Sequence, residues 1–264
     1  MSSDDPSQTA THGEDLSSEQ VMALTAVPIL EYGRAWMMTP AVAERAAELE
    51  LVRGFGFWVN GRAGVLGDVD ADVAAAAIGF MAPDSVRELW GVRKAGTTPS
   101  EVAEAYADVA AGWGRETLSA IDPSDLVRLT ELCDKIADAA LPSCGTLFAG
   151  WRSLDRPGDP AGDATIALNV LRELRGGAHL SAVHAVGIGP HGAIMAADDP
   201  VRGGAAGAER FGWTSPHPPA DETRRLEAER ITTEICRPAF DALDQGERAE
   251  FVALVRRARA AVDG

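Results

Sequence analysis

Two helix-start signatures recur in this chain, and nothing in it alternates as a β-strand does. Thr98-Pro99-Ser100-Glu101 has the composition of a capping box with proline in the first helical turn. Asp122-Pro123-Ser124-Asp125 repeats the arrangement. Behind each signature, apolar residues recur every three or four positions, which is the period of an amphipathic helix. The sequence therefore predicts an all-α protein.

Residues 163–187, DATIALNVLRELRGGAHLSAVHAVG, are apolar enough to form core yet carry Arg172, Glu173, Arg175, His179 and His184. In one straight helix, the apolar residues before Gly176 and those after Gly177 would face roughly opposite ways. Glycine tolerates a positive φ and close backbone approach, so a joint at this pair resolves the conflict. We expect a multi-helix bundle around a central, glycine-broken helix pair.

Composition restricts the class of partner. The chain has 264 residues and a formal net charge of −16, which argues against nucleic acid, whose phosphates need a basic face. The same charge disfavours anionic membranes. Its three cysteines are widely spaced and form no zinc pattern, which is typical of reduced thiols.

The polar, acidic N-terminus predicts a disordered tail over residues 1–16 and is unlike a signal peptide. No apolar run reaches the ~18 residues of a membrane span. We expect a cytoplasmic protein with one all-α domain over residues 17–264 and a sub-boundary available in the Gly- and Pro-rich loop 198–219.

The charged residues near Gly176-Gly177 allow two interpretations. Arg172, Glu173 and Arg175 could form a solvated face with local ion pairs. Alternatively, Arg175 and Arg62 point into a cleft and hold a carboxylate or phosphate through paired hydrogen bonds. Arg62 supports the second interpretation because its neighbours are glycines and aromatic residues rather than other charges.

His179 lies near the apolar face of the second half of this stretch. It could be a hydrogen-bonded core residue, or a ligand contact and general base, since imidazole titrates near neutrality. His184 is five residues away rather than four, so the pair predicts no metal site. The Gly-rich segments follow no strand of a βαβ unit and predict no dinucleotide site, which leaves the cofactor unknown.

Two motifs resemble a family of largely uncharacterised actinobacterial helical proteins, often labelled helix-turn-helix. The similarity covers roughly residues 30–262. The first motif matches Arg62, Leu66, Gly67, Phe80, Ala82 and Pro83; the second matches Leu171, Arg172, Glu173, Arg175, Gly176 and His179; a later Gly-Trp-Thr matches Gly212, Trp213 and Thr214.

The chain departs from that family in two places. After Gly212-Trp213-Thr214 the family continues as a winged helix, whereas this chain passes through SPHPPADE into a long helix. We therefore expect a winged-helix element that is reduced or absent. Leu174 and Gly177 stand where the family has a further histidine and an acidic residue, which weakens any catalytic role copied from it.

Our first hypothesis is a cytosolic small-molecule-binding protein, or an enzyme of actinobacterial metabolism, that acts on a polar or anionic ligand. Arg62, Arg172 and Arg175 would bind the ligand, and His179 and Glu173 would be catalytic. The indole rings of Trp58 and Trp213 would form the apolar wall of the ligand site.

The alternative is a helix-turn-helix transcriptional regulator, or a degenerate relative that has lost DNA binding. A third class is a helical protein that binds a partner protein. A homodimer formed through the C-terminal helices is compatible with the sequence, although no specific feature predicts it.

Overall fold

The computed structural model describes residues 15–199 and 202–264, so most of the predicted tail lies outside the described residues. Within those two ranges there are thirteen α-helices and no strand, which confirms the all-α fold and leaves no wing strand after Trp213. The helices are α1 (Ser18–Ala35), α2 (Pro40–Glu48), α3 (Gly56–Ala63), α4 (Ala71–Ile78), α5 (Pro83–Leu89), α6 (Pro99–Thr117), α7 (Pro123–Ala139), α8 (Thr146–Arg152), α9 (Pro160–Ala185), α10 (Gly189–Met195), α11 (Gly204–Arg210), α12 (Glu222–Phe240) and α13 (Gln245–Ala260).

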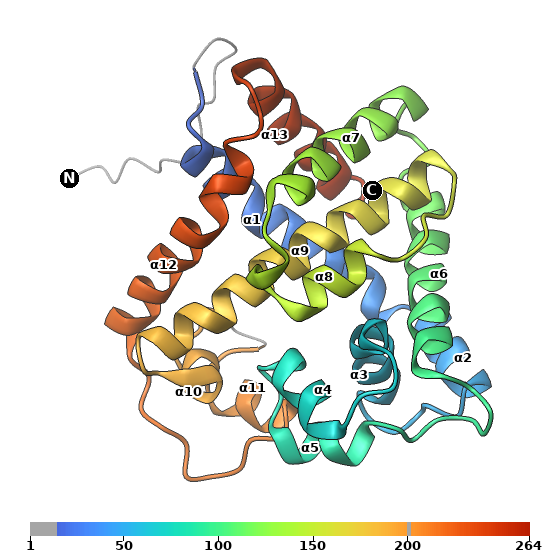
Figure 1. Cartoon of the computed structure of the whole chain (residues 1–264), viewed down its shortest axis with the longest axis vertical. Coiled ribbons are helices and arrows are strands. Elements are labelled where there is room, and N and C mark those ends of the chain that lie inside the picture. The colour runs from blue at the N-terminus through green and yellow to red at the C-terminus, as the bar shows by residue number, and fades with distance from the viewer. Residues whose placement is uncertain (1–14, 200–201) are drawn as a thin grey trace.

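Helix α9 lies at the centre of the arrangement, where it crosses behind α8 and between α12 and α6 (Figure 1). Its 26 residues extend about 39 Å at 1.5 Å per residue. It packs against α1, α6, α7, α8, α10 and α12. The helix begins at Pro160, before the stretch 163–187, and Asp159 caps it by accepting a hydrogen bond from the backbone N–H of Gly162 at 3.0 Å.

The expected break at Gly176-Gly177 is wrong, since α9 continues through both glycines to Ala185. A helix covered on several sides does not need one apolar stripe, so its apolar face can change direction along its length. Gly177 is required for close packing instead. A Cβ there would lie 2.4 Å from the Cys144 carbonyl oxygen and 2.7 Å from the Gly145 Cα.

The two ends of the described chain pack together. Helix α1 lies against α12 and α13. The Ser18 hydroxyl donates to the Asp241 carboxylate at 2.6 Å, and Arg259 donates to Glu31 at 2.6 Å. These contacts close the C-terminal helices over the N-terminal one, so that α1 and α9 share a buried core.

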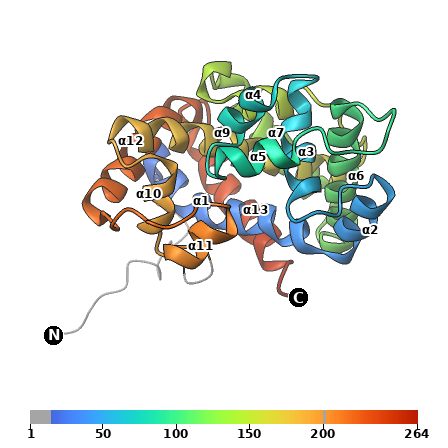
Figure 2. The same ribbon diagram turned by 90° about the horizontal axis from the view of Figure 1, so that it is seen from below.

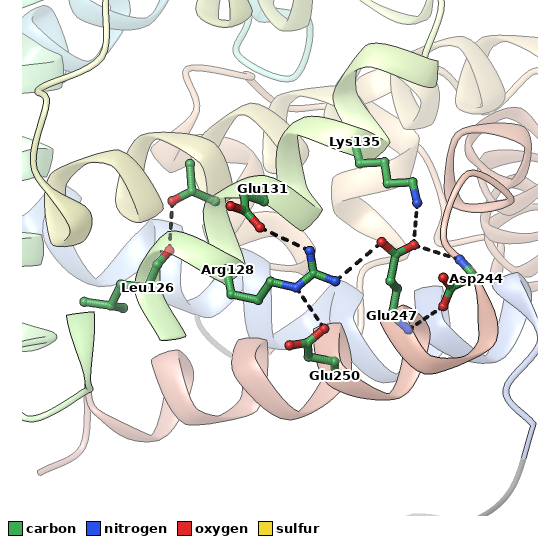
Figure 3. Close-up of polar contacts among 8 residues, drawn as sticks. Leu126, Arg128, Glu131, Lys135, Asp244, Glu247 and Glu250 are labelled. Atoms are coloured by element: carbon green, nitrogen blue, oxygen red, sulfur yellow. Dashed lines mark hydrogen bonds and ion pairs between the residues drawn. The ribbon is translucent and has the colours of Figure 1, made fainter. Parts of the chain in front are cut away.

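An ion-pair network joins α7 to α13 (Figure 3). Arg128 donates to Glu131 at 3.1 Å, to Glu250 at 3.0 Å and to Glu247 at 3.4 Å. Glu247 also accepts from Lys135 and from the backbone N–H of Asp244, so its side chain is only 14% exposed. Hydrogen bonds from Lys135 and Asp244 hold the pKa of Glu247 below its usual value.

Two short helices, α4 and α5, meet at the four-residue turn 79–82 and lie side by side (Figure 2). The turn begins at Gly79, whose φ of 73° is in the left-handed region that favours glycine. A Cβ on Gly79 would lie 2.6 Å from Leu180, so the turn rests on α9.

The segment 211–213 covers the same turn. Ala82 donates its backbone N–H to the Phe211 carbonyl at 2.8 Å, and the Trp213 indole donates to the Phe80 carbonyl at 2.9 Å. The expected loop 198–219 is therefore partly helical, since α11 lies within it. A sub-boundary there, and the single domain over residues 17–264, stay predictions. No described helix combines the length and the apolar composition that crossing a membrane requires.

The adjacent glycines of α9 give a first prediction. Gly177→Ala should destabilise the fold by about 1–3 kcal/mol, because its methyl group would overlap backbone atoms that cannot rotate away. Gly176→Ala should be neutral or stabilise by roughly 0.5–1 kcal/mol, because its nearest neighbour is 4.0 Å away and alanine favours a helix. Urea unfolding of both variants measures the difference, and equal midpoints would show that α9 does bend here.

The network around Glu247 predicts acid sensitivity. A carboxyl whose pKa is lowered in the folded state contributes stability above its unfolded pKa and loses it as the pH falls through the folded value. Glu247→Gln should therefore destabilise the protein at neutral pH and lose less stability than the parent below the ordinary glutamate range. Glu250→Gln, at the exposed edge of the same network, is the matched control. It should change the loss of stability at acidic pH less than Glu247→Gln does.

Candidate functional site

Arg62 and Glu173 form a buried, two-bond ion pair between α3 and α9. The Arg62 Nε donates to Glu173 Oε1 at 3.0 Å, and its Nη2 donates to Oε2 at 2.7 Å. Arg62 is 8% exposed and Glu173 is 2% exposed. The third nitrogen, Arg62 Nη1, makes no hydrogen bond with any described residue. A fixed guanidinium with one nitrogen left without a partner can bind a further acceptor.

Arg172 adds a second guanidinium to the same carboxylate. Its Nη1 donates to Glu173 Oε1 at 2.6 Å. Burial would raise the pKa of Glu173, but the charges of Arg62 and Arg172 outweigh it and lower the pKa. Burial also lowers the pKa of Arg172, although an arginine stays protonated. We call Arg62, Arg172 and Glu173 the ion triad; its formal charges sum to +1.

Trp58 supports the ion triad from the side. The Arg62 guanidinium carbon lies 4.5 Å from the centre of the Trp58 ring, within the range of a cation–π contact. Trp58 in turn packs against Phe55 and Phe211. The indole therefore holds the arginine side chain rather than facing the pocket described next.

A pocket of about 250 Å³ opens beside Arg62 and Glu173. Helix α4 and its turn form one wall, the segment before and at the start of α8 forms another, and α9 forms the floor. Besides the ion pair, the lining includes residues with a hydroxyl or thiol group and glycines whose backbone is accessible. They are Ser143, Cys144, Gly145, Thr146, Gly176, Gly177 and Ser181. The apolar lining residues are Ala76, Ala77, Ile78, Phe80, Leu147 and Leu180.

Arg175 and His179 lie on a different face of α9, towards α12. Arg175 pairs with Glu229, and His179 Nδ1 lies 2.9 Å from the Thr232 hydroxyl oxygen. The Thr232 hydroxyl donates to the Ala228 carbonyl at 2.7 Å, so it accepts from His179, which assigns the proton to Nδ1.

The electrostatic surroundings of His179 keep its imidazole neutral at pH 7. Burial lowers the pKa of His179, and the Glu229 carboxylate, 3.9 Å from Nε2, opposes that shift only in part. The ring stacks on Phe80 with centroids 5.7 Å apart. His179 is thus separated from the pocket by a side chain that lines it.

Trp213 lies in a third place. Its indole bonds the turn between α4 and α5, and its ring stacks on His191 with centroids 4.6 Å apart. The structure therefore brings Arg62, Arg172, Glu173 and Trp58 together but places Arg175, His179 and Trp213 elsewhere.

Sequence reasoning missed two of the residues that shape this region. Phe80 was noticed only as part of a family motif, although it connects the pocket, His179 and Trp213. Thr232, which orients His179, lies in a stretch of α12 where nothing distinguishes it from neighbouring polar residues. A long-range partner of this kind leaves no local sequence signal.

The turn between α4 and α5 has helix-turn-helix proportions, with four residues and a glycine between two helices. The exposed charged side chains of α5 are Asp84, Arg87 and Glu88. Arg87 is already paired with Asp72 and Asp84, each at 2.6 Å. This helix therefore offers no free basic face to phosphate.

Comparison with known proteins gives one match. A family model described as a helix-turn-helix family matches residues 29–224, well over half of the chain. The chain matches no curated protein and no solved structure.

The formal charge of +1 on the ion triad predicts which substitution in it destabilises the folded protein more. Glu173→Gln should cost about 3–5 kcal/mol, because it leaves two buried guanidiniums without a counter-charge. Arg172→Met should cost less, since it leaves the neutral Arg62–Glu173 pair with both of its bonds. Urea unfolding at neutral pH tests the order, and an Arg172→Met loss equal to that of Glu173→Gln would contradict it.

Proposed function

The chain belongs to the helix-turn-helix family, and we propose that it binds a small polar or anionic molecule in the pocket beside the ion triad. One observation carries this proposal: Arg62 is held rigidly at the pocket wall by Glu173 and Trp58, yet keeps Nη1 without a partner among the described residues. A preorganised donor of this kind costs little entropy to bind.

The rest of the lining fits a compact ligand with one polar side. About 250 Å³ is below the ~300–1,000 Å³ typical of pockets for drug-sized molecules, so a metabolite of modest size fits best. Hydroxyls of Ser143, Thr146 and Ser181 offer donors and acceptors, while Phe80 and Leu180 offer apolar contact. The unpartnered Nη1 of Arg62 favours a ligand that offers it an acceptor, such as a carboxylate or phosphate oxygen.

The structure supports ligand binding better than it supports catalysis by Glu173 and His179, the two residues predicted to be catalytic. Both oxygens of Glu173 accept hydrogen bonds from arginine, and its lowered pKa makes it a weak base. His179 keeps a free Nε2 lone pair but stacks behind Phe80. Catalysis by Glu173 and His179, and ligand binding by Arg175 and Trp213, stay predictions from the sequence.

The family description favours a second candidate, a transcriptional regulator, and the α4–α5 geometry agrees with it. The charges oppose it, since the chain carries −16 overall and the only arginine exposed on α5 is already paired. We therefore propose a relative that has lost DNA binding and uses the helix-turn-helix unit as a pocket wall.

Blocking the pocket from Gly176 tests the binding proposal. Native mass spectrometry of the gently purified parent should reveal an adduct that is lost on denaturation. Gly176→Leu should lose it, because the side chain projects into open space at the pocket floor. Gly112→Leu is the matched control, since Gly112 is also helical with nothing within 4 Å, but it lies on α6 away from the pocket.

If the parent carries no adduct, a second experiment replaces native mass spectrometry. The melting temperatures of the same three proteins are measured with a panel of small carboxylates and phosphate esters. Stabilisation of the parent and of Gly112→Leu, but not of Gly176→Leu, is the expected result. Equal responses of all three would contradict the pocket assignment. Salt-sensitive binding of a random-sequence DNA duplex, measured by fluorescence anisotropy, would support the regulator instead.

A further inference from the structure

Three hydrogen-bond donors deep in the molecule have no partner within residues 15–199 and 202–264. They are the indole Nε1 of Trp36, the hydroxyl of Tyr106 and the Nε of Arg172, and each is buried without a hydrogen bond to any described residue. Trp36 and Tyr106 are both 0% exposed. Buried donors are nearly always satisfied in folded proteins, so three together need an explanation.

The three donors belong to one region next to the ion triad. The rings of Trp36 and Tyr106 lie 4.6 Å apart between centroids. The Arg172 side chain packs on Gly33, one turn before Trp36, where a Cβ would lie 2.6 Å from the Arg172 Cδ. Tyr106 is also close enough for the charges of Arg62 and Arg172 to act on its hydroxyl.

The chemistry of the donors selects the occupant. Indole and guanidinium nitrogens can only donate, and the surrounding ion triad carries one positive charge more than negative. Water could also accept from these groups, but a water molecule would not offset the excess positive charge of the ion triad. A monoanion accepts from all three and removes the excess charge. None of the three residues lines the pocket beside Arg62, so an occupant shared by them would lie outside that pocket.

We propose that Trp36, Tyr106 and Arg172 form an interior binding site for a small monoanion of the halide class. The site is separate from the pocket ligand and does not depend on it. The ion compensates the charge of the ion triad and connects the C-terminal end of α1 to α6 and α9 through one shared acceptor. It would make folding stability depend on the halide concentration.

Anion exchange at constant ionic strength tests the site. The urea midpoint of the parent should be higher in sodium chloride than in sodium gluconate, whose anion is too large for an interior site, and should saturate with chloride. Arg172→Met should abolish the difference, because it removes one donor and the excess charge. Tyr106→Phe should raise the half-saturating chloride concentration about tenfold, since it removes one hydrogen bond to a charged group.

Two controls keep the result specific. Tyr32→Phe also removes a buried hydroxyl, but that hydroxyl is paired with Thr165 at 2.8 Å, so the chloride response should stay unchanged. Gly176→Leu should block only the pocket and leave the chloride response intact, which separates failure of this site from failure of the binding proposal.

Crystals soaked in bromide should show an anomalous peak among the three donors. Equal parent midpoints in chloride and gluconate would overturn the proposal, as would a chloride response that survives in both Arg172→Met and Tyr106→Phe. Either result would assign the donors to buried water, together with the Asn169 Oδ1, a buried acceptor that also has no described partner.

Discussion

The Glu173 carboxylate, shared by two guanidiniums, is the interaction on which the site depends. It fixes α3 against α9 through Arg62, and it holds the Arg172 side chain against α1. Burying three charges carries a desolvation penalty that well-packed apolar residues would avoid. Stability alone therefore does not account for this choice of residues. A rigid, charged wall beside a pocket does, and that is why we interpret the ion triad as binding apparatus.

Local chemistry explains which parts of the fold could be predicted. The capping box at Thr98–Glu101 is present as expected, and Asp122 caps α7. Each depends on residues within one helical turn, so no knowledge of the tertiary structure is needed. The all-α class follows from such signals repeated along the chain.

The failed glycine joint explains why the site was predicted only in part. In a continuous helix, residues six positions apart point about 120° away from each other. Glu173 and His179 must then face different neighbours, and they do: Glu173 meets α3, whereas His179 meets α12. The assumed joint allowed both to converge. The sequence contains no local signal against it, because the need for Gly177 comes from the backbone of residues 144–145, some thirty positions away.

The α4–α5 unit has an inner side that lines the pocket and an outer side that carries charged residues. In α4–α5 the turn is fastened on both sides, to Leu180 of α9 and to the segment 211–213. Residues of α4 and Phe80 line the pocket, so the unit's inner side contributes to the site whether or not its outer side contacts DNA. A change of charge on α5 would alter only the outer side, because Asp84, Arg87 and Glu88 make no contact with the ion triad. Under the function proposed above, DNA binding could therefore be lost without disturbing the pocket.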